Sequence, residues 1–570
     1  MFTPLVAFVA LFCVSAPAVK KKVVVRQLAP GVELLQEVTP SGDKDGPLVV
    51  TTVRIDPKVK GVRVEAALGG GGVWANDATL GREIPSKTVA RRKAVAGINA
   101  GFFPFAGNPI GLHVENGELV TEPGLPRTAF VLLDDGTVSF PRFSFEGTVN
   151  GGALQGLNRK PGKGNELLLF TPIFADKTLK TDGRVEVIVE GVPLPLKLGS
   201  IVTGKVAAVR EGGLTPLAPG TLVLSAGGDS VDWLKGWAKP GEAVTIALKA
   251  TPLDRKLDPS KILQAVTGSG RLLAGGKFAL DLKAEKIGAS FSTTRHPRTA
   301  VGVTADGKLL FVTVDGRQAS LSRGASLTEL AGIMLALGAV EAVNLDGGGS
   351  SACAVRGAVA NSPSEGVERP VADSLLVFAE ESSMPQSEVA LPTQPQVLTV
   401  GETRSFPLPE GVDSASVAWT VAGGIGFVDQ EGSFRALRAG KGALVLWRGT
   451  QASRIPLVVV KSGAKATPEP KLDNAAFVPQ AVFNDDGTQL TITIANSEGD
   501  KLGSEAIQLT VTGGTVVSNP VSTDSRGVAS VTIQWDTATA PDARQVKVSS
   551  PLKRFQSVIV KPAKKLPTQK

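Results

Sequence analysis

Residues 299–317 read TAVGVTADGKLLFVTVDGR, and residues 339–351 read AVEAVNLDGGGSS. The first stretch holds two runs rich in apolar and β-branched residues on either side of Asp306 and Gly307. An Asp-Gly pair in that position predicts two strands joined by a tight hairpin turn. The second stretch is typical of a buried strand over 339–345 that leads directly into an acidic residue and three glycines.

The segment between these strands predicts a helix. Ser326 and Glu329 have the spacing of a capping box, and Gly338 suits the end of the helix. Apolar residues follow at helical spacing, namely Leu327, Leu330, Ala331, Met334 and Leu337. We therefore expect strands and a helix to meet close to the glycine-rich stretch.

Composition predicts a strand-rich protein of several domains. The chain has 570 residues, against roughly 100–200 for a single domain. Its 65 glycines and 38 prolines indicate many turns between short strands. The first domain is therefore expected to be α+β and strand-dominated, with short helices.

The C-terminal third alternates short strands with glycine turns. Trp419, with the segments 432–436 and 439–442, resembles a bacterial immunoglobulin-like repeat. The runs 488–495, 506–512 and 523–532 are similar to invasin-type immunoglobulin-like domains. Each all-β sandwich domain has two open interpretations, a spacer or a module that attaches to glycan or to a surface.

These patterns divide the chain into seven segments. The order is a signal peptide at 1–18, an α+β domain at 23–380, a linker at 381–396, an immunoglobulin-like domain at 397–460, a linker at 461–472, an invasin-like domain at 473–562 and a basic tail at 563–570.

The N-terminus predicts export from a bacterial cell. Residues 1–18 carry no charge, contain the apolar run 5–12 and end in Ala-Pro-Ala, as signal peptides do. A retained N-terminal anchor is the alternative interpretation. Cleavage leaves Cys353 as the only cysteine, which excludes an intrachain disulfide. No later segment is long and apolar enough to span a membrane, so we expect a secreted, periplasmic or cell-surface protein.

The charge distribution argues against a nucleic-acid partner. The formal net charge is +8, but Lys and Arg are scattered among 53 acidic residues and form no basic stripe with interleaved aromatics. A positive balance favours anionic ligands such as phosphate-bearing glycans. With two histidines and one mature cysteine, no zinc site and no cofactor are predicted. A divalent cation held by Asp315 and Asp346 stays open, although no pattern indicates one.

The stretch 346–351 is the strongest candidate for chemistry. Three glycines after a strand allow backbone N–H groups to converge on an anion, which makes a phosphate cradle one interpretation. A tight β-turn is the other. The stretch has neither the spacing and lysine of a P-loop nor the pattern of a nucleophile elbow.

Five motifs occur in a fixed order along the chain. They are Asn99-Ala100-Gly101-Phe102-Phe103 with Gly111 downstream, Arg295-His296-Pro297-Arg298-Thr299-Ala300, Asp315-Gly316-Arg317, residues 344–351 and Arg369-Pro370-Val371. Taken together they resemble the phosphodiester glycosidase family over most of 23–380. The resemblance implies a hydrolase that cleaves the bond between a sugar's anomeric carbon and a phosphodiester oxygen. The expected substrate is a carbohydrate or sugar phosphate of an envelope or exopolysaccharide glycan.

The resemblance assigns roles to residues that suit this reaction. Positive charge that develops on the sugar ring calls for a carboxylate, and Asp346 and Asp315 are the expected catalytic pair. Guanidinium groups bind a charged phosphodiester through forked hydrogen bonds. The expected substrate-binding residues are Asn99, Gly101, Phe102, Arg298, Thr299, Arg317, Asn344, Gly347, Gly348, Gly349, Ser350 and Arg369.

Structural explanations remain open for each of these residues. Arg298 and Arg369 could pair with carboxylates across strands, and Asn99 and Asn344 could hydrogen-bond turn backbones. His113 and Cys353 are interpreted as structural. For the whole protein, the alternatives to an enzyme are a non-catalytic glycan-binding protein and an adhesive cell-surface protein.

Overall fold

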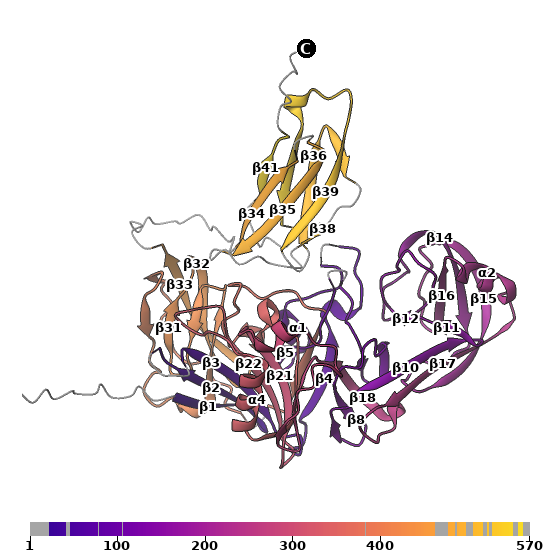
Figure 1. Ribbon diagram of the computed structural model, residues 1–570. Helices are drawn as coiled ribbons and strands as arrows, with labels where there is room; N and C mark the ends of the chain where they lie inside the picture. The colour runs from indigo at the N-terminus through magenta and orange to yellow at the C-terminus, as the bar shows by residue number, and fades with distance from the viewer. Residues whose placement is uncertain are drawn as a thin grey trace, which may run out of the picture.

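The computed structural model describes residues 22–41, 46–77, 79–104, 107–381, 384–461, 477–484, 487–496, 506–516, 521–523, 527–550 and 557–562. The predicted signal peptide, the basic tail and all but the first residue of the predicted linker at 461–472 lie outside these residues. Strands dominate the described chain (Figure 1), which confirms the expected strand-rich class. The helices are α1 (Pro85–Arg92), α2 (Ser230–Trp237), α3 (Ala289–Thr293) and α4 (Leu327–Ala336), with short 3-10 turns η1 (Gly69–Gly71), η2 (Pro259–Lys261), η3 (Gly348–Ser350), η4 (Ser414–Ser416) and η5 (Pro541–Ala543).

The predicted hairpin lies inside an eight-stranded sheet, here called the first sheet. Ala300 pairs with Val312 across the hairpin and with Asn344 on its other side. The strand that leads into Asp346 is therefore interior and flanked by partners. The strand order is β1 (Lys22–Ala29), β2 (Val32–Thr39), β3 (Leu48–Ile55), β22 (Leu309–Val314), β21 (Arg298–Thr304), β23 (Ala339–Asn344), β19 (Arg271–Ala274) and β20 (Lys277–Phe278).

Helix α4 covers one face of the first sheet. Ser326 Oγ accepts the Glu329 N–H, and the Glu329 carboxylate accepts the Ser326 N–H, so the predicted capping box is complete. The apolar face of the helix packs on a core that includes Leu310 of β22. Gly338 has a φ of 90°, a left-handed conformation that glycine adopts at low cost and that ends the helix.

A nine-stranded sheet, here called the second sheet, packs against the other face of the first sheet. Val301 of the first sheet and Ile98 of the second belong to one buried core. The strand order is β27 (Gln396–Thr399), β33 (Gln451–Val460), β32 (Gly440–Arg448), β29 (Val417–Ala422), β25 (Ala358–Val359), β24 (Cys353–Val355), β5 (Ala96–Asn99), β26 (Asp373–Phe378) and β4 (Arg63–Leu68).

The second sheet continues across the predicted linker at 381–396. Val359 of β25 pairs with Val421 of β29, so strands on both sides of that linker share one sheet. Trp447 of β32 also lies in the core of the first domain. Val389, within the linker, is buried in the core of the following domain. The domain boundaries stay a prediction, but the first two domains are joined by pairing and by packing.

Residues 113–267 form two further sheets, and most of the larger one extends as a separate lobe (Figure 1). The larger has the order β11 (Gly152–Leu154), β10 (Phe143–Val149), β17 (Ala243–Pro252), β15 (Ile201–Gly213), β14 (Lys180–Glu190), β16 (Thr221–Gly227), β13 (Glu166–Phe170) and β12 (Gly156–Leu157). The smaller has the order β7 (Glu118–Thr121), β6 (His113–Glu115), β18 (Ile262–Thr267), β8 (Ala129–Leu133) and β9 (Val138–Ser139).

The C-terminal part adds three small sheets. A three-stranded sheet, β28 (Thr403–Ser405), β31 (Ser433–Ala436) and β30 (Gly426–Val428), shares a core with β29 and β32. Two four-stranded sheets pack on one another and form the yellow domain of Figure 1. Their orders are β34 (Phe477–Phe483), β35 (Gln489–Asn496), β39 (Val528–Trp535), β37 (Gly514–Val516), and β38 (Val521–Ser522), β36 (Ala506–Thr512), β40 (Gln545–Ser549), β41 (Val558–Val560).

Candidate active site

Asp346 lies where the two large sheets meet. It follows β23 of the first sheet, and its N–H donates to the carbonyl of Ala100, which follows β5 of the second sheet, at 2.9 Å. The side-chain amide of Asn99 donates to the Asp346 carbonyl at 2.7 Å. Strand ends from both sheets therefore fix the backbone on each side of this carboxylate.

Asn99 and Thr299 are buried supports beneath Asp346. The Asn99 side-chain oxygen accepts the Thr299 hydroxyl at 2.8 Å and the Ala352 N–H at 3.1 Å. Both side chains are fully buried. Asn344 is equally buried and donates to the Ser269 carbonyl at 3.0 Å. These three residues were predicted to bind substrate; the structure places them under the site, and direct substrate contact stays a prediction.

The Asp346 carboxyl group is partly exposed but lies in a poorly solvated position. Burial raises its pKa to about 6, while the Ser350 hydroxyl, the Arg369 charge and the Gly347 N–H act in the opposite direction. The negative charge of Asp373 adds to the rise. At neutral pH the group is mostly ionised, and its proton affinity is higher than that of an ordinary aspartate.

Sequence reasoning missed Asp373 and interpreted its partner His113 as structural. Asp373 begins β26, and one of its oxygens accepts the Gly101 N–H at 2.7 Å. The other oxygen hydrogen-bonds His113 Nδ1 at 2.8 Å. His113 Nε2 is buried and has no hydrogen-bond partner among the residues the structure describes. The only sequence signal was scarcity, because the chain has just two histidines.

The three glycines serve close packing more than anion binding. The N–H groups of Gly347, Gly348, Ser350 and Ser351 all donate to acceptors within the protein. A Cβ on Gly347 would lie 2.8 Å from the Pro297 carbonyl oxygen, which is closer than real Cβ atoms approach. Of the two interpretations of this stretch, the structure favours the tight turn.

Arg317 lies beside Gly348, and His296 lies beside Arg317. Arg317 has a φ of 58°, a conformation that residues other than glycine rarely adopt. A Cβ on Gly348 would lie 3.2 Å from Arg317 Nη2, so the guanidinium group covers this glycine. Arg317 Nη2 also lies 3.3 Å from His296 Nδ1. Burial, with the charges of Arg317 and Arg298, lowers the pKa of His296 to about 4, so its ring is neutral at physiological pH.

Arg369 and Glu365 cover Gly349. Arg369 Nη2 donates to Glu365 Oε1, and a Cβ on Gly349 would overlap both atoms. Arg369 is part-buried, and its charge acts on Asp346. Arg317 and Arg369 thus approach the glycine turn at successive positions.

Asp315, the other predicted catalytic carboxylate, anchors a neighbouring segment. Its oxygens accept the Asn361 side-chain N–H at 2.7 Å and the Ser362 N–H at 2.9 Å. The residue is 1% exposed, and burial raises its pKa to about 7. The carboxylate whose charge acts on Asp346 is that of Asp373. A catalytic role for Asp315 stays a prediction.

Arg298 is almost fully buried and binds backbone carbonyl groups. Its guanidinium donates to Ala325 at 2.9 Å, to Phe291 at 2.7 Å and to Thr294 at 2.9 Å. Burial, with a smaller effect of the Arg317 charge, lowers its pKa to about 10. Phe102 is half-buried and lies 6.2 Å from the Phe291 ring, centroid to centroid. Arg298 therefore holds the backbone around Phe291 in place, whereas the half-buried Phe102 side chain keeps an exposed face.

Among the residues that the structure describes, no group of three or more His, Cys, Asp or Glu side chains has an arrangement that could hold a metal ion. Among the same residues, no helix combines the length and apolar character needed to cross a membrane.

Comparison with known proteins identifies a related family. Residues 198–378 match the family model described as phosphodiester glycosidase. The uncharacterized protein YomE from the SPbeta prophage of Bacillus subtilis (strain 168) is 43% identical over 83 residues, covering 15% of this chain and 13% of that protein. The N-acetylglucosamine-1-phosphodiester alpha-N-acetylglucosaminidase of Bos taurus is 43% identical over 68 residues, 12% of either chain. The chain thus spans about one eighth of these relatives.

Three solved structures align with parts of this chain at low sequence identity. A hypothetical protein from Synechocystis has a TM-score of 0.49 and 22% identity, covering 64% of this chain and 65% of that chain. A putative exported protein from Burkholderia pseudomallei K96243 has a TM-score of 0.49 and 27% identity, with coverage of 58% and 74%. The catalytic domain of the zebrafish N-acetylglucosamine-1-phosphodiester alpha-N-acetylglucosaminidase has a TM-score of 0.36 and 17% identity, with coverage of 64% and 89%.

The family match includes four of the five sequence motifs in full. Arg298, Arg317, Asp346 and Arg369 all fall within residues 198–378. Over residues 198–378, this chain is therefore similar to the phosphodiester glycosidase family.

Proposed function

We propose that this protein is a secreted hydrolase that cleaves the bond between an anomeric carbon and a phosphodiester oxygen in envelope or exopolysaccharide glycans. The observation that carries the proposal is the setting of Asp346. Its carboxyl group is partly exposed, and burial raises the pKa of this group to about 6. Arg317 and Arg369 both approach the turn on which it lies. The family match supports the glycosidase class.

The reaction breaks the bond between the anomeric carbon and the phosphodiester oxygen. The electron pair leaves with the phosphate, and the oxygen of water ends on the sugar carbon while a proton is released. Positive charge develops on the sugar ring, which ionised Asp346 stabilises or attacks. Arg317 and Arg369 bind the phosphate through charge-assisted hydrogen bonds.

The neighbouring imidazole fits this chemistry. His296 is neutral at physiological pH because its pKa is about 4, so it supplies no proton to the leaving group. A phosphate monoester leaves as a stable anion and needs less help from a general acid than a sugar alkoxide does.

The test measures release of free sugar from a panel of sugar-1-phosphodiesters, including nucleotide sugars and methyl glycosyl phosphates. Asp346→Asn keeps an oxygen that can accept the Gly347 N–H, and we expect it to lower turnover by a factor on the order of 10³ or more. The matched control is Asp135→Asn, at an exposed hairpin turn, which should turn over like the wild type.

Two outcomes would count against the proposal. Equal turnover by wild type and Asp346→Asn would remove Asp346 from the chemistry. No turnover across the panel, with sugar phosphates still raising the melting temperature, would indicate a glycan-binding protein instead.

We also propose that the described sheets after residue 381 belong to two immunoglobulin-like domains. The buried Trp419 and the core around it support the first, and the two packed four-stranded sheets support the second. In this proposal export depends on the predicted signal peptide at 1–18.

A further inference from the structure

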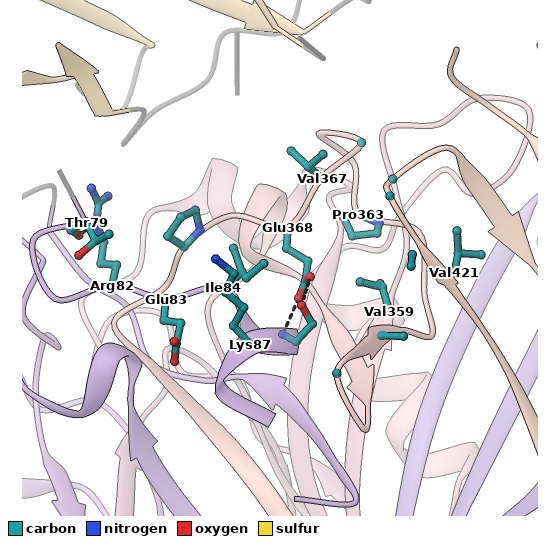
Figure 2. Close-up of a pocket in the computed structure, with 18 of the residues that line it drawn as sticks. Thr79, Arg82, Glu83, Ile84, Lys87, Val359, Pro363, Val367, Glu368 and Val421 are labelled. Carbon is teal, nitrogen blue, oxygen red and sulfur yellow. Dashed lines mark hydrogen bonds between the residues drawn. The ribbon is translucent and has the colours of Figure 1, made fainter. Parts of the chain in front are cut away.

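A pocket of about 810 Å³ lies at the junction of the first two domains. Its walls come from residues 70–87, 357–370 and 421–441. Figure 2 shows Arg82 and Glu83 on one side, Pro363 and Glu368 over the middle, and Val421 on the far side. The volume falls within the range of about 300–1,000 Å³ typical of ligand sites. The middle domain therefore lines a cavity that the first domain alone leaves open on one side.

The pocket carries an excess of positive charge. Four basic residues line it, namely Arg82, Lys87, Arg438 and Lys441, against the acidic residues Asp77, Glu83 and Glu368. The side chains of Lys87 and Lys441 are exposed, and neither has a carboxylate partner among the residues that the structure describes. An anionic ligand would meet two solvated cations that no internal acid neutralises.

The acidic residues of the pocket are already engaged by the protein. Glu368 accepts the Ser86 N–H at 2.7 Å (Figure 2). Glu83 forms an ion pair with Arg91 at 2.9 Å. Asp77 accepts the Thr79 N–H at 2.8 Å. The negative charges therefore stabilise the walls and oppose an incoming anion less than free carboxylates would.

The pocket and the candidate active site share a wall. Asn361 and Ser362 line the pocket, and both donate hydrogen bonds to Asp315, two residues before Arg317. Further along the same segment, Glu365 and Arg369 cover Gly349. The segment 361–370 therefore lines the pocket and also contains Glu365 and Arg369, which cover the glycine turn.

We propose that this pocket binds an anionic sugar-phosphate unit of the same polymer whose glycosyl phosphate bond is cleaved at Asp346, so that the middle domain supplies part of the substrate site. This inference rests on the proposed function. Lys87 and Lys441 bind phosphate oxygens from opposite domains, and apolar Ile84, Val359 and Val421 offer faces for a sugar ring. The substrate class is therefore a polymer with repeated phosphodiester linkages.

The experiment compares a methyl glycosyl phosphate with a pentamer of the same glycosyl phosphate unit. In the double variant Lys87→Ala/Lys441→Ala we expect the KM of the pentamer to rise about tenfold, as loss of two charge-assisted contacts predicts. Hydrolysis of the methyl compound should not change. The matched control is Lys205→Ala/Lys239→Ala, two exposed lysines on the larger of the two sheets within 113–267 and on the loop that follows α2, which should leave both KM values unchanged.

Direct binding separates failure of this inference from failure of the proposed function. If the wild type cleaves neither compound, the proposed function fails. Titration of the pentamer then still tests the pocket, and equal affinity of wild type and the Lys87 and Lys441 double variant overturns it. If cleavage occurs, two results for the double variant overturn the inference. One is an unchanged KM for the pentamer, and the other is an equal loss of activity on both substrates. Equally tight binding of a neutral oligosaccharide of the same length would also overturn it.

Discussion

The proton affinity of Asp346 depends on charges that other segments supply. Burial is the largest cause of the raised Asp346 pKa. Asp373 of β26 raises this pKa further through its charge, whereas Arg369 lowers it. Both effects are electrostatic, so they should change when either charge is removed without a change of shape. The ionised form of Asp346 is the one that stabilises positive charge on the sugar. The rate constant kcat/KM should therefore rise with pH through a midpoint at the Asp346 pKa of about 6 and then level off.

Two isosteric substitutions should move this midpoint in opposite directions. Asp373→Asn removes a negative charge but keeps an oxygen for the Gly101 N–H, so the midpoint should fall. Arg369→Gln removes a positive charge, so the midpoint should rise. The measurement is kcat/KM from pH 4 to pH 9. Weaker substrate binding lowers the plateau of this profile, whereas a changed Asp346 pKa moves its midpoint, so the two effects are read separately. A midpoint that stays at the wild-type value in both variants would show that another group controls the profile.

At the scale of single residues, the sequence predicted which residues gather near the turn better than it predicted their contacts. Asp346, Arg317 and Arg369 were predicted from motifs, and the structure brings them to one glycine turn. The pairing of Asp373 with His113 could not be predicted, because the two residues are 260 positions apart and meet only after β26 and β6 have folded. The burial of Arg298 could not be predicted from the sequence either, because its acceptors are backbone carbonyl groups, which every residue has.

Among the elements, the glycine turn has little room for a side chain at Gly349. A Cβ at Gly349 overlaps Glu365 and Arg369, so Gly349→Ala must displace that ion pair. We expect turnover to fall at least tenfold and the melting temperature to drop by several degrees. Sugar release and differential scanning calorimetry measure the two effects.

A second glycine provides the matched control. Gly332 lies inside α4, and a Cβ there would meet no atom within 4 Å beyond the backbone of its own helix. Gly332→Ala should stabilise the helix by roughly 0.5–1 kcal/mol and leave turnover unchanged. If Gly349→Ala behaves like Gly332→Ala, close packing at the turn does not explain the glycine triplet.

Elements with local signals were predicted closely, whereas the pairing of sheets was not. The hairpin β21–β22 and the start of α4 follow from an Asp-Gly turn and a capping box, which act over a few residues. The glycine turn combines both kinds of contact. The Gly347 N–H donates to the adjacent Asp346 side chain, whereas the Gly348 N–H donates to the distant Pro297 carbonyl, which no local pattern indicates.

On the scale of the whole molecule, the first two domains share structure that the sequence assigned to separate units. Gln430 links them, because its N–H donates to Gln36 at 2.9 Å and its carbonyl accepts Arg26 Nε at 3.1 Å. Proline- and serine-bearing segments such as 381–396 usually mark linkers, but composition does not report whether the strands on either side pair. Here they pair at Val359 and Val421.

This arrangement predicts different results for two truncated chains. A chain that ends at residue 381 loses the middle domain, including Trp447 from the shared core and one wall of the pocket, so its melting temperature should fall by about 10 °C and its turnover should drop. A chain that ends at residue 461 keeps the shared sheet and should retain wild-type turnover, with a melting temperature within a few degrees. Calorimetry and sugar release test both chains. If the chain ending at 381 keeps wild-type stability and turnover, the middle domain is only a spacer. If the chain ending at 461 is inactive, the last domain contributes to the site in a way that the packing described above does not explain.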